Sequence, residues 1–271
     1  MSNYWFATLR GKRVGRQENL CGLYLATCSA LYDELLDEDM YSHEQIMEST
    51  NYLLGEHTLK QTTLTESLRR MHENLLLKNE YEKYFSHIIK AQTESMVQLS
   101  GQDTSEDEIR RCSYEKGGYA MLTWRCAMSH PLVKGEEEAI YLMGVLLQLV
   151  DDIFDLYRDR ESGEQTLVST STNLFAFQRE YDDLIERTIS LYKALDYPPE
   201  NIRRMLFQMM TGLSRGAVAL QQHLHLQGNE LLPFDKNRYS RAELICNMER
   251  PGNLLKSLFS AEKWKGQILA P

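Results

Sequence analysis

The sequence predicts an all-α protein, a helical bundle of about nine or ten helices. Apolar residues recur at spacings of three and four, and no stretch alternates apolar and polar residues with the period of two that marks a strand. No proline lies between Pro131 and Pro198, so long segments are free to form helices. The 271 residues are 42% hydrophobic, and no repeat or linker divides them. We therefore expect a single domain over residues 1–271.

Helix start and stop signals set the expected boundaries. Ser100–Glu108 is polar and rich in turn residues, and Thr104 or Ser105 is a suitable N-cap, with Glu108 three residues after Ser105. The helices expected in order cover residues 17–39, 43–55, 59–79, 80–99, 105–129, 135–161, 173–195, 199–227 and 239–264, the last weakened by Pro251 and Gly252.

Composition excludes several classes of function. The net charge of −9 and the pI near 5.4 argue against a nucleic-acid partner, because phosphate backbones call for a basic surface. No apolar run approaches the roughly 18 residues of a membrane span, and the first residues lack the apolar core of a signal peptide. The five cysteines show no CxxC pairing, as expected for reduced packing residues. We expect a soluble cytoplasmic protein.

The stretch from Leu146 to Gly163 carries the strongest chemical signal. Its acidic and amide side chains are Gln148, Asp151, Asp152, Asp155 and Asp159. On a helix they fall within about a third of the circumference, and apolar residues occupy the rest. Unpaired carboxylates amid apolar neighbours are costly, and their hard oxygen atoms suit Mg²⁺, which completes its shell with water and phosphate. The alternative is a solvated acidic face, but the apolar surroundings favour a metal site.

A second acidic cluster lies at Leu31–Asp39. Asp33 and Asp37 share a helix face, with Glu34 beside them, and they oppose the helix dipole near its C-terminus. Small residues on the same face leave room for a pocket, although they are also common at close-packed positions. These small residues are Ala26, Ser29 and Ala30.

The two clusters together resemble the class I isoprenoid synthase superfamily, which includes prenyl diphosphate synthases, squalene-synthase-like enzymes and terpene cyclases. The pattern Gln148-x-x-Asp151-Asp152-x-x-Asp155 is similar to the second aspartate-rich motif of prenyltransferases, and Asp159 and Gly163 extend the match. Asp33-Glu34-x-x-Asp37 resembles a variant first motif, with Glu in its second place.

The resemblance implies a central cavity in which the two motifs face each other and hold Mg²⁺, three ions in all, or Mn²⁺ in its place. The substrate would be a prenyl diphosphate, contacted by Lys116, Gln148, Arg238 and Tyr239. Aromatic faces would stabilise a carbocation in a dry pocket, although each of these residues is also a plausible core residue. The aromatic candidates are Tyr32, Tyr119, Trp124, Phe154 and Phe207.

Two departures from the motifs of chain-elongating enzymes favour a one-substrate reaction. Met40–Glu44 stands where elongating enzymes carry a pair of arginines, and Gly163-Glu164-Gln165 stands where they tend to have Gly-Lys. We therefore expect a terpene synthase, a lyase that forms a terpene hydrocarbon or alcohol. The alternatives are a prenyltransferase, chain-elongating or head-to-head, and a catalytically silent helical scaffold. A homodimer is the usual state of this fold.

Other residues carry weaker signals. His223 and His225 are two positions apart, so at most one can face the core of a helical bundle. Met205, Met209 and Met210 are expected in the core. The basic residues Lys12, Arg13 and Arg16 form either a cap over the site or a frayed tail.

Overall fold

The computed structural model describes residues 2–37, 77–95, 98 and 104–270. Within these ranges the chain forms ten α-helices and a short 3₁₀ helix, without a strand, so the all-α prediction is confirmed. The elements are α1 (Ser2–Arg10), α2 (Arg16–Asp37), α5 (Lys78–Ser95), α6 (Glu106–Arg125), α7 (Glu136–Ser162), α8 (Leu174–Lys193), α9 (Pro199–Gln227), η2 (Lys236–Arg238), α10 (Arg241–Leu244), α11 (Pro251–Glu262) and α12 (Lys265–Leu269). The helices expected over residues 43–55 and most of 59–79 lie outside the described residues. No described helix is both long and apolar enough to cross a bilayer.

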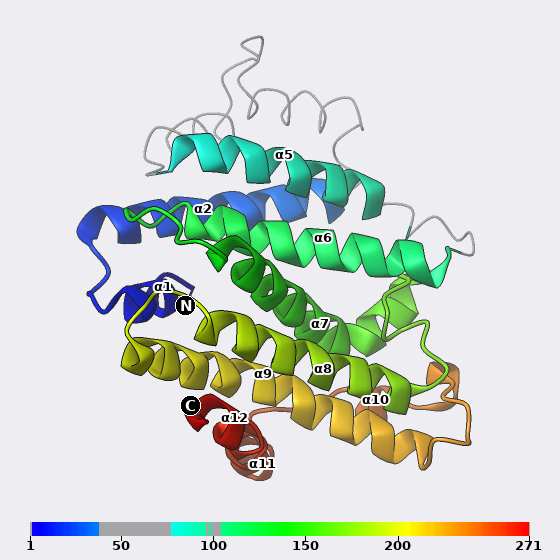
Figure 1. The fold of residues 1–271 in the computed structure, drawn as a ribbon. Helices are drawn as coiled ribbons and strands as arrows, with labels where there is room; N and C mark the ends of the chain where they lie inside the picture. The colour runs from blue at the N-terminus through cyan, green and yellow to red at the C-terminus, as the bar shows by residue number, and fades with distance from the viewer. Residues whose placement is uncertain (1, 38–76, 96–97, 99–103, 271) are drawn as a thin grey trace.

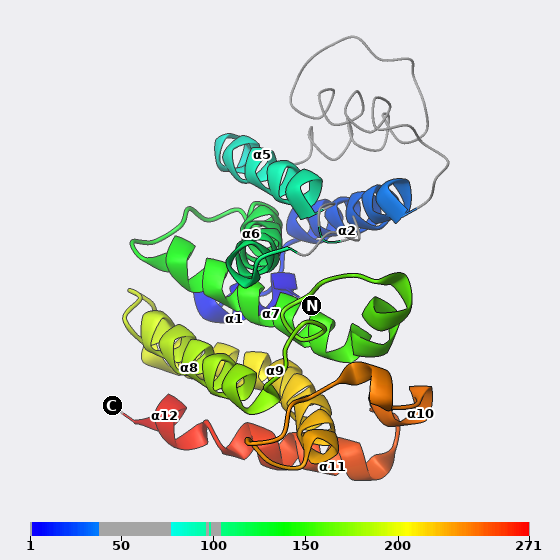
Figure 2. The same cartoon turned by 90° about the vertical axis from the view of Figure 1, so that its right-hand side faces the viewer.

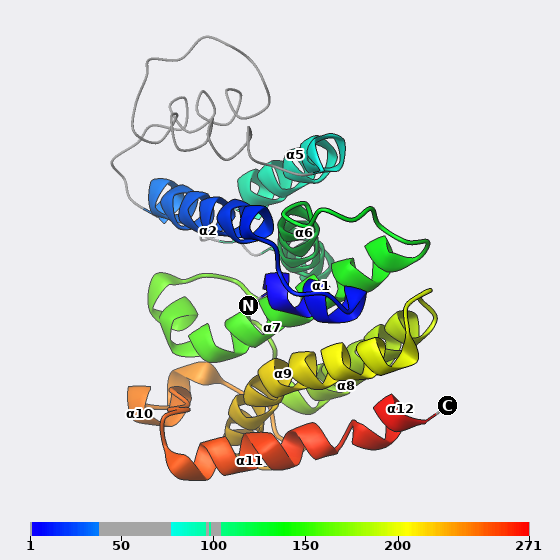
Figure 3. The same ribbon diagram turned by 90° about the vertical axis from the view of Figure 1, so that its left-hand side faces the viewer.

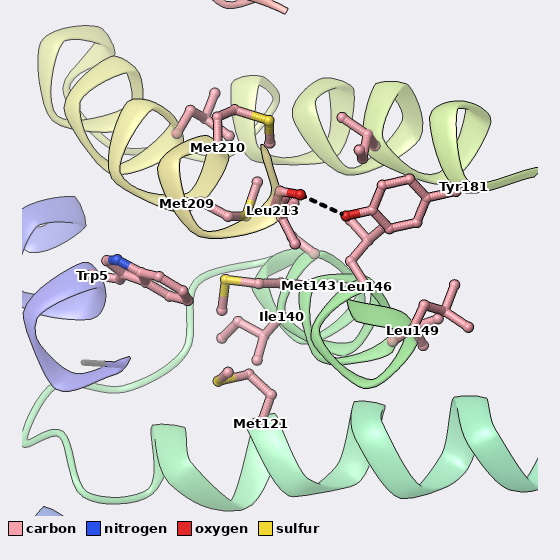
Figure 4. Packing of buried hydrophobic residues seen from close by; sticks show 14 of the residues in the cluster. Trp5, Met121, Ile140, Met143, Leu146, Leu149, Tyr181, Met209, Met210 and Leu213 are labelled. Carbon is pink, nitrogen blue, oxygen red and sulfur yellow. Dashed lines mark hydrogen bonds between the residues drawn. The ribbon is translucent and has the colours of Figure 1, made fainter. Parts of the chain in front are cut away.

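Helix α7 runs through the middle of the molecule (Figure 1). Helices α2, α5 and α6 lie on one side of it, and α8, α9, α11 and α12 lie on the other. Its apolar face is fully buried and meets side chains from α1, α6, α8 and α9 (Figure 4), among them Met209 and Met210 as expected. The Tyr181 hydroxyl donates a hydrogen bond of 3.0 Å to the Leu213 carbonyl and so joins α8 to α9 beside α7.

A buried ion pair fixes the turn between α6 and α7. The guanidinium of Arg125 donates to the carboxylate of Glu136 at 2.7 Å, and both side chains are 0% exposed. Arg125 also donates to the carbonyls of His130 and Pro131, and the Tyr197 hydroxyl donates to Glu136. A buried pair is stable only when its remaining donors and acceptors are satisfied. These contacts meet that need and hold the start of α7 in register with the end of α6.

The first residues form a packed helix, which the sequence analysis missed. Trp5, Phe6 and Leu9 of α1 are buried. Lys12, Arg13 and Arg16, predicted to form a cap or a tail, are exposed. Arg10 is bound in a network around Glu18, a carboxylate that is 3% exposed. Glu18 also accepts hydrogen bonds from Gly15 and Ser129, so it joins α1, α2 and the turn after α6.

Two expected boundaries differ from the structure for local reasons. The helix expected to run to about residue 129 ends at Arg125, because the next amides bond three residues back rather than four and tighten the chain. The helix expected over residues 239–264 is split, since Pro251 starts a new helix at α11. Ser105 is the N-cap of α6, as predicted, and its hydroxyl accepts from the Glu108 amide.

Candidate active site

The candidate site depends on an unusually close crossing of α6 and α7. At the crossing, Gly117 faces Gly144 with no side chain between the two backbones. A Cβ on Gly117 would lie 2.5 Å from the Gly144 carbonyl oxygen and 2.6 Å from the Gln148 Cβ. Only glycine allows such an approach. One turn from Gly117 along α6 and two turns from Gly144 along α7, Ser113 therefore reaches Asp152.

Asp152 is a buried acid of the site with two side-chain neighbours, Gln148 and Ser113. Its carboxylate is 4% exposed, accepts a 2.9 Å hydrogen bond from Gln148 Nε2, and lies 3.5 Å from the Ser113 hydroxyl. Burial raises the pKa of Asp152 to about 7, against the Gln148 hydrogen bond, which lowers it. The negative charge of Asp151 raises this pKa further, and the positive charge of Lys116 lowers it. Gln148 and Lys116 therefore act on the carboxylate that the motif places at its centre.

Asp159 forms the second buried acid, two turns along α7. It is 2% exposed, and the Thr166 hydroxyl donates to it at 3.1 Å. Burial raises its pKa to about 8, assisted by the negative charges of Glu164 and Asp152. Asp159 also acts on Lys236: burial lowers the pKa of this lysine, whereas the negative charge of Asp159 raises it. A lysine of η2 thus lies within electrostatic reach of this acid.

The acidic stripe of α7 fits a divalent cation. Asp152 and Asp159 form no ion pair with any lysine or arginine of the described residues, although both lie in a buried setting that disfavours negative charge. Asp155 is half-buried and 3.6 Å from Arg158, and Asp151 is exposed. The residues described do not gather three His, Cys, Asp or Glu around one point. Mg²⁺ nevertheless needs only one or two carboxylates besides water and phosphate.

The other acidic cluster lies in the last turns of α2. In Figures 2 and 3 this half of α2 lies on the same side of the molecule as the end of α7. Ala26 and Ser29, predicted to line a pocket, are exposed there. The predicted site side chains that lie outside the described part are those of Ala30, Tyr32, Asp33, Glu34 and Asp37.

Arg238 and Tyr239, the other residues predicted at the diphosphate, have local partners. The side chain of Arg238 is 70% exposed and pairs with Asp235 at 3.2 Å. The Tyr239 hydroxyl donates to the Leu226 carbonyl at 2.7 Å, and its ring stacks on Phe234. Their contacts hold the loop after α9 in place.

The predicted aromatic pocket residues occupy different surroundings. Tyr119 is half-buried and stacks on the ring of His87, with 4.4 Å between centroids. Trp124 and Phe154 are partly buried against the core. Phe207 lies on the surface of α9 and is 36% exposed.

Several residues of the site were missed in the sequence. Ser113, Thr166 and Lys236 contact or influence the two buried acids from three other segments. A hydroxyl or a lysine outside a motif gives no local signal, so only the tertiary structure reveals these residues. His223 is the buried member of the histidine pair, as expected for one at most, and its ring bonds to the Ile153 carbonyl at 3.2 Å.

Comparison with known proteins gives one distant likeness. No family model matches the sequence, and no curated protein does. The chain is similar to a solved structure described as a dehydrosqualene synthase in complex with a ligand. The similarity has a TM-score of 0.49 and 13% sequence identity, and covers 98% of this chain and 92% of that one. The function proposed below rests instead on the side chains around Asp152 and Asp159.

Proposed function

We propose that this protein is a Mg²⁺-dependent class I terpene synthase, which ionises an allylic prenyl diphosphate and converts the carbocation into a hydrocarbon or alcohol. The observation that carries the proposal is the buried Asp152, which Gln148 and Ser113 orient. A carboxylate in a dry setting is neutralised either by a proton or by a cation, and a bound cation would keep Asp152 ionised at neutral pH. The motif that contains it is the one that resembles the diphosphate-binding motif of this superfamily.

The chain's own residues would divide the work. Asp152 and Asp159 would hold Mg²⁺ with oxygen atoms fixed by Gln148, Ser113 and Thr166. The expected ligands of the other cluster are Asp33, Glu34 and Asp37, and Asp151 and Asp155 would complete the α7 set. Mg²⁺, when bound, supplies Lewis-acid stabilisation of charge on the departing diphosphate. Lys116 would add positive charge beside Asp152, and Lys236 beside Asp159.

One geometric observation favours one substrate over two. The basic run Arg10-Gly11-Lys12-Arg13 resembles the residues that hold a second diphosphate in chain-elongating enzymes. In this chain Arg10 is bound to Glu18 at 2.7 Å. From Arg16 to Asp33, α2 rises by roughly 25 Å at 1.5 Å per residue. The basic run therefore lies at the opposite end of α2 from the acidic cluster, too far away to hold a second diphosphate beside the first. For this reason the prenyltransferase is the second candidate.

The decisive test measures products and their dependence on Asp152. Purified protein is incubated with geranyl, farnesyl or geranylgeranyl diphosphate, alone and with isopentenyl diphosphate, with Mg²⁺ or with chelator. We expect a terpene and free diphosphate from a single substrate, only with Mg²⁺. Asp152→Asn keeps the size and the hydrogen-bond acceptor of the side chain, so it should lower turnover at least about 100-fold with helical circular dichroism unchanged.

A matched control separates charge at the site from charge elsewhere. Asp183 is an exposed aspartate of α8, so Asp183→Asn removes the same charge far from the motif and should leave turnover unchanged. Longer diphosphates that form only with isopentenyl diphosphate would identify a prenyltransferase. Full turnover in Asp152→Asn would contradict the proposal, and absence of product from every substrate would favour the scaffold.

A further inference from the structure

Helix α11 exposes its large apolar residues and buries its small ones. It packs on α9, and the residues that face inward are small or polar, with Ser257 buried and Asn253 and Ser260 half-buried. The residues that face solvent are Leu254 (43% exposed), Leu255 (56%), Leu258 (59%) and Phe259 (75%). Burial in the bundle cannot explain this pattern, because the hydrophobic effect favours the reverse orientation.

The exposed side chains form one continuous apolar face. At about 100° per residue, Leu254, Leu255, Leu258 and Phe259 fall within one arc of roughly 140°. In Figures 2 and 3 α11 lies at the outer edge of the molecule, with α9 on its inner side. Contiguous apolar patches of this kind mark binding surfaces. No described residue covers this face, which is therefore a candidate binding surface.

Charge indicates what that partner is. Residues 250–271 contain four Lys or Arg and one Glu, a net charge of +3 within a chain of net charge −9. Lys256 lies along the edge of the apolar arc and Arg250 precedes it, and both are exposed. Lys263 and Lys265 pair with neighbouring carboxylates. Lys256 and Arg250 place positive charge beside the exposed leucines of α11.

A groove that meets the apolar face at Phe259 adds polar donors. It lies between α9 and α11 and has a volume of about 570 Å³. Its lining includes Gln221, His225, Lys256 and Phe259. Hydrogen-bond donors and a positive charge beside an apolar ring match the boundary between a phosphate headgroup and an acyl chain.

We propose that α11 binds the surface of a membrane that contains anionic phospholipid. The helix would lie in the interface plane, with Leu255, Leu258 and Phe259 among the acyl chains and Lys256 and Arg250 at the headgroup phosphates. A second copy of the chain is less suitable, because symmetric pairing of two α11 helices would bring their basic edges together. This inference goes beyond the proposed enzymatic function and does not depend on it.

The test is sedimentation of the full chain with vesicles of phosphatidylcholine alone or with added phosphatidylglycerol. We expect binding to the mixed vesicles that falls as salt is raised, and little binding to neutral ones. The triple variant Leu255→Ser, Leu258→Ser, Phe259→Ser should bind at least about tenfold more weakly. The control Leu23→Ser changes a leucine on α2 that is 63% exposed, and it should bind like the wild type.

Separate measurements keep the inference open to refutation. All the altered side chains are exposed, so circular dichroism and melting should match the wild type, and the single variant Lys256→Glu tests the charge alone. The proposal is overturned if the wild type fails to bind mixed vesicles, or if it binds neutral vesicles equally well. It is also overturned if light scattering shows a dimer that the triple variant dissociates while vesicle binding is unchanged.

Discussion

Replacement of Gly117 by alanine tests whether the helix crossing sets the geometry of the candidate site. The added Cβ would meet the Gly144 carbonyl oxygen at 2.5 Å, against at least 3.4 Å for an ordinary contact. Both obstructing groups are close to the backbone of α7, so a side-chain rotation cannot relieve the clash. The two helices must therefore separate by about 0.9 Å at this point.

The expected loss of stability follows from two opposing effects. Overpacking of a buried contact costs about 1–3 kcal/mol. Alanine is the better helix former by about 1 kcal/mol, which offsets part of that cost. The net loss is about 0–2 kcal/mol, or up to about 4 °C in melting temperature for a chain of this size.

Activity should suffer more than stability. Separation of α6 from α7 by about 0.9 Å moves Ser113 out of reach of Asp152, which it now contacts at 3.5 Å, and disturbs Gln148, whose Cβ obstructs the new methyl group. Misplacement of catalytic groups by about 1 Å can cost about 100-fold in rate. We therefore expect Mg²⁺-dependent diphosphate release to fall by roughly 10- to 100-fold while the protein stays folded.

Gly212 provides the matched control for this substitution. It lies inside α9, and a Cβ there would meet Trp5 at 3.9 Å, an ordinary contact. Gly212→Ala should therefore melt at or slightly above the wild-type temperature and keep full activity. Gly144→Ala should behave like Gly117→Ala, and the double variant should lose less than the sum of the two. If Gly117→Ala melts as high as Gly212→Ala, the reasoning is refuted.

Two further predictions concern charge. The pKa values of Asp152 and Asp159 are raised to about 7 and 8, so without metal the free energy of unfolding should fall as pH rises from about 4 to 8. Mg²⁺ should then raise the melting temperature more at pH 8 than at pH 6, and an equal shift at both would argue against these ligands. Glu18→Gln should lower stability by about 3 kcal/mol, measured by urea unfolding, because Arg10, whose side chain is only 14% exposed, loses its charged partner. Burial alone raises the pKa of Glu18, but the bonds from Arg10, Gly15 and Ser129 hold it well below its usual range, so its contribution is present above about pH 4.5 and lost below. Glu200→Gln, at an exposed ion pair, should cost less than about 1 kcal/mol at any pH, and an equal loss in the two variants would contradict the role of Glu18.

The sequence predicts contacts within a helix far better than contacts between helices. Gln148 and Asp152 are four residues apart, so their hydrogen bond follows from helical geometry alone. Ser113 and Asp152 are 39 residues apart, and their approach depends on a glycine crossing that no local pattern reveals. The same limit explains why Thr166 and Lys236 were not predicted at the site, since both reach Asp159 through turns in the chain.

Hydrophobic patterning also fails where a helix is short or where its apolar face points away from the core. Helix α1 has only nine residues, too few to show several repeats of the helical period, although Trp5, Phe6 and Leu9 lie on its buried side. Helix α11 has a clear apolar face, but periodicity cannot tell whether that face points into the bundle or away from it. In both cases the tertiary neighbours decide, α9 above all.

Glu164 connects the charge balance of the site with the choice between reactions. It stands where chain-elongating enzymes tend to carry lysine, and its charge raises the pKa of both Asp152 and Asp159. A lysine there would neutralise part of the acidic stripe and offer a second contact to phosphate. Glutamate instead deepens the negative potential, which under the proposed function would be balanced by bound cations together with Lys116 and Lys236. A site balanced in this way suits one diphosphate held through metal ions, which is why we place the one-substrate reaction first.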